Sequence, residues 1–133
     1  MKNKLYIKQI KGKGRGVFSF TSFAKDELIE ECALITLPAQ DFDIIASTEM
    51  VNYCFYIDKD EKTLAIALGF GSLYNHLLRA NAHHIIDKEK KTISIFALRD
   101  IPAQEEISIN YNGEPGNDSL EWFSSRNIHY RPG

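Results

Sequence analysis

Cysteine is scarce in this chain, and both of its cysteines, Cys32 and Cys54, lie in apolar stretches. The two could pair with each other, but two cysteines do not make a disulfide framework, and the simplest interpretation is a pair of buried thiols in a reducing compartment. We therefore expect a cytoplasmic location, or the interior of a host cell. His83, His84 and His129 do not have the spacing of a zinc site with Cys54, so we expect no metal.

Long apolar runs and an excess of one charge are also missing. No run approaches the roughly 18–20 residues of a membrane span, and no apolar core follows the basic N-terminus, so we expect neither a span nor a signal peptide. Lys and Arg number 16 against 18 Asp and Glu, which gives a net charge of -2. A nucleic-acid-binding protein usually carries a basic excess or stripe, so we expect no specific nucleic-acid partner.

The 133 residues suffice for a single domain, and we predict one over 1–133. Alternating and β-branched segments predict many short strands, with helical spacing only after Pro38. Strands and long helices do not alternate, which argues against a doubly wound sheet. We predict strands at 5–10, 17–20, 28–37, 52–57, 63–68, 84–87, 92–98 and 106–111, and a helix within 38–48.

Three segments carry polar or glycine-rich patterns of the kind that builds sites. Gly12-Lys-Gly-Arg-Gly16 falls between two predicted strands, and its glycines allow a close backbone approach. Asn75-His76 is a polar step inside an otherwise apolar stretch. The last predicted strand ends at Tyr111, before the turn signal Asn112-Gly113. Buried amides, imidazoles and phenols need hydrogen-bond partners, so these segments are the candidate site.

In this order and at this spacing, the segments resemble the SET-domain protein lysine methyltransferases in a minimal form, close to small bacterial and viral members. Gly14-Arg-Gly-Val-Phe18 is similar to the first glycine motif, and Tyr74-Asn-His76 with Asn81 to the Asn-His motif. The segment 98–107, followed by Asn110-Tyr111, is similar to the final tyrosine strand. The resemblance, which spans 12–111, implies a β-clip-like fold of small curved sheets, a C-terminal pseudoknot and one or two short helices.

The resemblance also implies a cofactor, S-adenosylmethionine, and a reaction, methyl transfer to the ε-amine of a lysine in a protein. Tyr111 would be the catalytic residue, where the substrate amine meets the methyl group. The cofactor would be held by two segments, the glycine motif and the Asn-His motif, with His76 using its main chain. The implied cofactor-binding residues are Lys13, Gly14, Arg15, Asn75 and His76.

A lysine side chain needs an apolar, often aromatic sleeve around its methylenes. Strand alternation places Tyr53 and Phe55 on one face, and each aromatic candidate could instead be a core residue. The tail, 112–133, would close the channel, as it commonly does in the family, and an aliphatic Ile109 would leave room for higher methylation states. The predicted channel residues are Tyr53, Phe55, Tyr74, Ile109 and Trp122.

The chain departs from the family pattern at Leu77, Leu78 and Ala80, where the family carries Ser, a polar residue or Cys, and Pro. The alternative is therefore a catalytically silent SET-like domain that binds a protein or peptide through Leu77 and Leu78. A generic β-rich interaction module is a third interpretation. A mildly acidic chain suits a basic substrate such as a histone tail or a ribosomal protein, and a homodimer is plausible by analogy.

Overall fold

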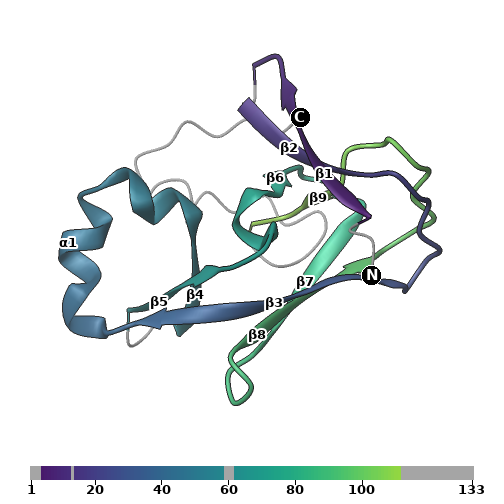
Figure 1. Ribbon diagram of the computed structural model, residues 1–133. Helices are drawn as coiled ribbons and strands as arrows, with labels where there is room; N and C mark the ends of the chain where they lie inside the picture. The colour runs from purple at the N-terminus through teal and green to yellow at the C-terminus, as the bar shows by residue number, and fades with distance from the viewer. Residues whose placement is uncertain (1–3, 13, 59–61, 112–133) are drawn as a thin grey trace.

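The computed structural model describes residues 4–12, 14–58 and 62–111 (Figure 1). The described residues form three β-sheets joined by short helical segments and turns. The prediction of a mostly β fold with short helices is therefore confirmed. Figure 1 shows helix α1 at the left end, the hairpin of β1 and β2 at the top, and the small pair of β6 and β9 just below the hairpin.

The hairpin consists of β1 (Leu5–Ile10) and β2 (Gly14–Ser19), paired antiparallel along their whole length. The glycines were expected to interrupt the chain before a strand at Val17, and this was wrong for two of them. Gly14 and Gly16 pair with Ile10 and with Lys8 inside the ladder. Gly14 has φ of 82°, a left-handed conformation that glycine adopts without strain, so the strand can begin there.

The largest sheet is antiparallel and has five strands in the order β4-β5-β3-β8-β7. Its central strand β3 is ten residues long because it changes partner along its length. Its first part, up to Ala33, pairs with β8, and 34–37 pairs with β5. The sheet's bounds are β3 Leu28–Leu37, β4 Cys54–Asp58, β5 Thr63–Ala67, β7 Ala82–Asp87 and β8 Thr92–Ala97.

The helix predicted within 38–48 is present, but it is short and is flanked by 3-10 turns. The whole segment comprises the 3-10 turn η1 (Ala39–Asp41), helix α1 (Phe42–Ala46) and the 3-10 turn η2 (Glu49–Tyr53). These cover a small core of Val51, Cys54 and Leu64. Among the described residues, no helix combines the length and hydrophobicity needed to cross a bilayer.

The main core lies between the hairpin, the large sheet and a parallel pair of two-residue strands, β6 (Asn75–His76) and β9 (Ser108–Ile109). Asn75 pairs with Ser108, and His76 with Ile109. The last strand was expected over 106–111, but β9 is shorter, because Ile107 instead forms an isolated bridge with Val17. The Asn-His motif and the final tyrosine segment therefore meet at the β6–β9 pair, which we call the crossing, while the threading of a pseudoknot stays a prediction.

Candidate active site

The first part of the site is the contact of the Asn-His motif with the glycine motif. The side-chain amide of Asn75 donates hydrogen bonds to the main-chain oxygen of Arg15 at 2.9 Å and to Oε2 of Glu106 at 2.7 Å. Residues 60 and 31 positions away in the sequence thus converge on one amide group. The structure therefore brings the predicted residues Arg15 and Asn75 together, and adds Glu106, which the sequence analysis did not single out.

Gly16 makes this convergence possible. A Cβ atom at this position would lie 2.7 Å from Oε2 of Glu106, 3.1 Å from Nδ2 of Asn75 and 2.5 Å from Cδ1 of Ile10. A side chain at this position would therefore have to displace the ends of these three side chains. The glycine leaves this space to its neighbours and so forms a cradle for the Asn75 amide and the Glu106 carboxylate.

Asn81 ties the two crossing segments together. Its Oδ1 accepts a hydrogen bond from the main-chain N–H of Ser108 at 2.9 Å. Its Nδ2 donates to the main-chain oxygen of Glu106 at 2.8 Å and to Oε2 of Glu105 at 2.9 Å. Asn81 belongs to the motif that the sequence resembles, but the sequence alone assigned it no role.

Tyr111 is held at both its main chain and its side chain. Its main-chain N–H donates to Nδ1 of His76 at 3.0 Å, and the two rings lie 5.1 Å apart. An accepting Nδ1 means that the imidazole is neutral, with its proton on Nε2. The hydroxyl of Tyr111 donates to the main-chain oxygen of Tyr74 at 2.7 Å. The phenol therefore has a fixed position beside the Asn-His motif.

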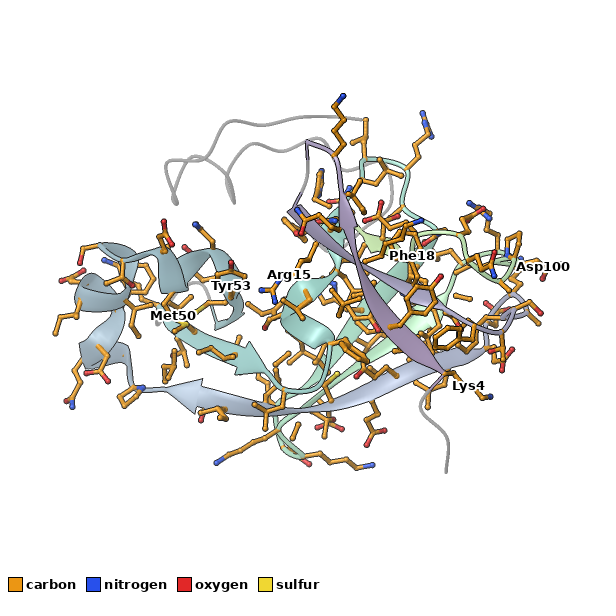
Figure 2. All side chains as sticks on the ribbon, turned by 45° about the horizontal axis from the view of Figure 1, so that its top comes forward. Lys4, Arg15, Phe18, Met50, Tyr53 and Asp100 are labelled. Carbon is orange, nitrogen blue, oxygen red and sulfur yellow. The ribbon has the colours of Figure 1, made fainter. Side chains whose placement is uncertain are left out.

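A pocket opens beside this phenol. It is small and partly open to solvent, and Tyr111 is one of its walls. Four residues predicted for the catalytic centre or the channel meet here, three of them aromatic side chains from segments far from Tyr111 in sequence. Figure 2 shows Tyr53 and Met50 on the helical segment that borders β4. The pocket is lined by Asn52, Tyr53, Cys54, Phe55, Ser72, Tyr74 and Tyr111.

The predicted channel residues differ in their surroundings. Tyr53 is 43% exposed at the rim, while Phe55 and Tyr74 are buried. Ile109 is fully buried in the main core, and the structure does not bring it to the pocket lining. Lys13, Trp122 and the tail that was expected to close the channel lie outside the described residues.

Behind the pocket, Tyr74 is joined to Glu30 of β3. The Tyr74 hydroxyl donates to Oε1 of Glu30 at 2.7 Å. Burial and the Glu30 carboxylate raise the pKa of Tyr74 well above its usual value. Burial, with Glu30 next in importance, also raises the pKa of the Cys32 thiol to about 12. Both groups are therefore neutral donors at physiological pH, and neither is a nucleophile.

At Leu77 and Leu78, where the sequence departs from the family pattern, the main chain still forms hydrogen bonds to the end of the last strand. The main-chain N–H of Leu77 donates to the oxygen of Ile109 at 3.1 Å, and the oxygen of Leu78 accepts from Nδ2 of Asn110 at 3.2 Å. Both leucines are half-buried, and neither belongs to the large apolar side chains that the structure exposes. The main chain at both leucines therefore hydrogen-bonds to the segment that contains β9 and Asn110.

In the described ranges, no group of three or more His, Cys, Asp or Glu residues is placed to hold a metal ion. The histidines that could have suggested one, His83 and His84, lie on β7 and contact aromatic rings. The ring centres of His84 and Phe55 lie 5.2 Å apart, and those of His83 and Phe96 lie 5.8 Å apart. Burial, with His83 next in importance, lowers the pKa of His84 to about 4. The imidazole of His84 is therefore neutral in the fold.

Comparison with known proteins agrees with this geometry. Residues 14–112 match the SET domain family. A histone-lysine N-methyltransferase of Schizosaccharomyces pombe, named as specific for H3 lysine-37, is 28% identical over 111 residues, which cover 84% of this chain and 75% of that protein. The crystal structure of a putative histone methyltransferase of Plasmodium falciparum superposes with a TM-score of 0.67 and 28% identity, covering 84% of this chain and 95% of that one.

The match over most of the chain, on a fold of this kind, defines a SET domain. The chain belongs to the SET-domain family, as the motif order predicted. Both relatives are named as histone methyltransferases, which supports the predicted enzyme class, a protein-lysine methyltransferase.

Proposed function

We propose that this chain transfers methyl groups from S-adenosylmethionine to the ε-amine of a lysine in a protein. The observation that carries the proposal is the meeting of Tyr111 with an aromatic-lined pocket next to the Asn75 crossing. The names of the two relatives support a histone as the first substrate to test. The proposal assigns the crossing to the cofactor and the pocket to the lysine side chain.

The residues at the crossing fit the methionine end of the cofactor, which carries an ammonium group. The Asn75 amide donates through Nδ2 to Arg15 and Glu106, so Asn75 presents Oδ1 as an acceptor. The Glu106 carboxylate next to it supplies negative charge. Because Gly16 has no side chain, it leaves room for both of these groups. Asn75 and Glu106 would therefore bind the ammonium, with the β2 main chain at Gly14 and Arg15 beside it.

The cofactor supplies a methyl group on a positively charged sulfur, and the chain must hold the amine of the substrate lysine neutral and aligned. A free lysine has a pKa of about 10.4, so at pH 8 only about one amine in a few hundred is neutral. Aromatic walls at Phe55 and Tyr74 disfavour the charged form by desolvation. Because the Tyr111 hydroxyl donates a hydrogen bond to the main-chain oxygen of Tyr74, its own oxygen can accept a hydrogen bond from an N–H of the amine and orient it. Alignment is therefore the main contribution of this site.

The test is methyl transfer from labelled S-adenosylmethionine to histones and to a mixed lysate, with cofactor affinity measured by calorimetry. Tyr111→Phe should lower kcat by about 10²–10³-fold and leave cofactor affinity within about threefold, because it removes one hydroxyl that acts on the amine. The matched control is Tyr6→Phe, since Tyr6 stacks on Phe18 and Phe20 in the hairpin, away from the pocket lining. It should keep wild-type activity.

Three other results would contradict parts of the proposal. Cofactor binding without transfer to any substrate would favour a silent binding domain. A lack of cofactor binding would show that the crossing does not hold S-adenosylmethionine. Full activity in Tyr111→Phe would remove Tyr111 from the reaction centre.

A further inference from the structure

The carboxylate of Glu30 receives two hydrogen bonds from one short segment. Oε1 accepts from the hydroxyl of Tyr74 at 2.7 Å, and Oε2 accepts from the main-chain N–H of Phe70 at 3.0 Å. The two donors lie at the two ends of a turn that contains η3 (Gly71–Leu73). Glu30 itself lies on the central strand β3, outside the pocket lining. One carboxylate thus fastens both ends of this turn to the centre of the large sheet.

The turn is shaped around this carboxylate. A Cβ atom on Gly69 would lie 2.5 Å from Oε2 of Glu30, and Gly69 has φ of 63°, so a side chain there would be both crowded and strained. A Cβ on Gly71 would lie 3.0 Å from Sγ of Cys32. Glu30 is half-buried, and its carboxylate accepts hydrogen bonds from an N–H and a phenol. The placement of Glu30 is therefore specific.

Tyr74 connects this carboxylate to the site. At one end, its side-chain hydroxyl binds Glu30, and at the other, its main-chain oxygen accepts the hydroxyl of Tyr111, each at 2.7 Å. Tyr74 is only 1% exposed, so its ring cannot change rotamer without displacing core neighbours. Because the Tyr74 ring is buried and its hydroxyl is held by Glu30, the main-chain carbonyl group of Tyr74 is also restrained. The restraint runs from β3 through Tyr74 to the Tyr111 phenol.

We propose that Glu30 is a positioning residue for methyl transfer, which acts through Tyr74 to fix the direction of the Tyr111 hydroxyl. This inference rests on the proposed function, since it assumes that Tyr111 orients the substrate amine. A direct hydrogen bond from Glu30 to the substrate is not part of it. Loss of the restraint would misalign the amine and slow the chemical step, with little effect on substrate binding.

Two variants remove the restraint in different ways. Tyr74→Phe deletes the hydroxyl that binds Glu30 and keeps the carbonyl that binds Tyr111. Glu30→Gln replaces one of the two acceptor oxygens by an NH₂ group, which accepts no hydrogen bond. Either the Tyr74 hydroxyl or the Phe70 N–H then loses its acceptor. The matched control is Glu31→Gln, the same chemical change on the exposed neighbour of Glu30 in β3.

The kinetic result expected for Tyr74→Phe and Glu30→Gln is a fall in kcat of about 10–100-fold with KM changed less than about threefold. Glu31→Gln should match the wild type. In a Tyr111→Phe background, Glu30→Gln should cause no further loss of kcat, because the hydroxyl that it orients is absent. An equal additional loss in that background would overturn the inference, since Glu30 would then act independently of Tyr111.

A second measurement needs neither cofactor nor turnover. In protein labelled with ¹³C at tyrosine Cζ, the Tyr111 resonance, assigned with Tyr111→Phe, should shift in Tyr74→Phe and Glu30→Gln but not in Glu31→Gln. If the wild type transfers no methyl group, the proposed function fails and this shift alone decides whether the restraint exists. An unchanged Tyr111 resonance, or unchanged kcat in an active enzyme, would overturn the inference. If Glu30→Gln does not fold, Tyr74→Phe gives the answer.

Discussion

Asn81 and Ser108 hold each other across the crossing, 27 residues apart in the chain: the Ser108 main-chain N–H donates to Oδ1 of Asn81 at 2.9 Å. Both residues are almost completely buried, at 4% and 3% exposure. Since β6 and β9 are only two residues long, their ladder contributes few hydrogen bonds of its own. The Asn81 side chain therefore supplies hydrogen bonds between the two segments that a longer pair of strands would otherwise supply.

Replacing Asn81 by alanine should destabilise the fold strongly. The change would leave the Ser108 N–H and the Glu106 carbonyl without this partner in a buried place. We expect the free energy of unfolding to fall by about 2–4 kcal/mol, as measured by urea denaturation. The control is Arg99→Ala, which removes an exposed ion pair with Glu105 and should cost less than about 1 kcal/mol. Equal losses in both variants would contradict the role given to Asn81.

Gly16→Ala should impair cofactor binding more than stability. The added methyl group would press on Glu106 and Asn75, whose side-chain ends can move aside. We expect the affinity for S-adenosylmethionine, measured by calorimetry, to fall about tenfold or more, because the proposed acceptors are displaced.

Gly12→Ala is the matched control for Gly16→Ala. Gly12 has φ of 83°, so alanine is strained there by about 1–2 kcal/mol, but nothing lies within 4 Å of its Cβ position. The control should lower the melting temperature and leave cofactor affinity unchanged. If both variants lost affinity to the same degree, the cradle at Gly16 would not be the cause.

The thiol of Cys32 should make the fold sensitive to alkaline pH. Its pKa is raised to about 12 in the folded chain from 9.0, so between these values the unfolded chain alone releases the proton. Stability is therefore fully present below pH 9 and is lost as pH rises toward 12. From pH 8 to 10, the wild type should lose about 1 kcal/mol more than Cys32→Ala in urea denaturation. If the stabilities of the two proteins changed with pH in the same way, the Cys32 thiol would have the same pKa in the folded and the unfolded chain, and the prediction would be wrong.

His84 should have the opposite effect on the acid side. Its pKa is lowered from 6.5 to about 4 in the fold, so at intermediate pH only the unfolded chain binds the proton. The stability that neutral His84 supports is present above pH 6.5 and is lost as pH falls through about 4. Between these values the wild type should lose about 2–3 kcal/mol more than His84→Gln. An imidazole resonance of His84 that titrates near pH 6.5 by NMR would contradict this prediction.

Local pattern predicted much of the secondary structure. The strands β1 and β3 have the bounds predicted from alternation and β-branched content, and both hairpins of the large sheet agree with their predicted segments to within about two residues. These elements pair largely with near neighbours in the sequence or, like β3, are rich in β-branched and apolar residues. Their conformation therefore follows from the residues within them.

The errors arise where a distant segment decides the local structure. Gly16 was expected to interrupt a strand, yet it pairs with Lys8 inside β2, and the absence of a side chain there leaves space for Asn75 and Glu106. The last strand was expected to continue to Tyr111. It ends at Ile109, because Tyr111 bonds to His76 and Tyr74 and not to a ladder. A local sequence pattern does not show which distant residues will bond to a given residue.

The sequence by itself determined the β-rich class, the order of the three motifs and, through them, the family. It also determined which residue types were available for a site, including the Tyr111 phenol and the Asn75 amide. Only the tertiary structure decided that Glu106 shares the Asn75 amide, that Asn81 ties the crossing, and that Glu30 holds Tyr74. The reason is physical: a buried polar group needs a partner, but the partner can come from any part of the chain that packing brings within hydrogen-bond distance.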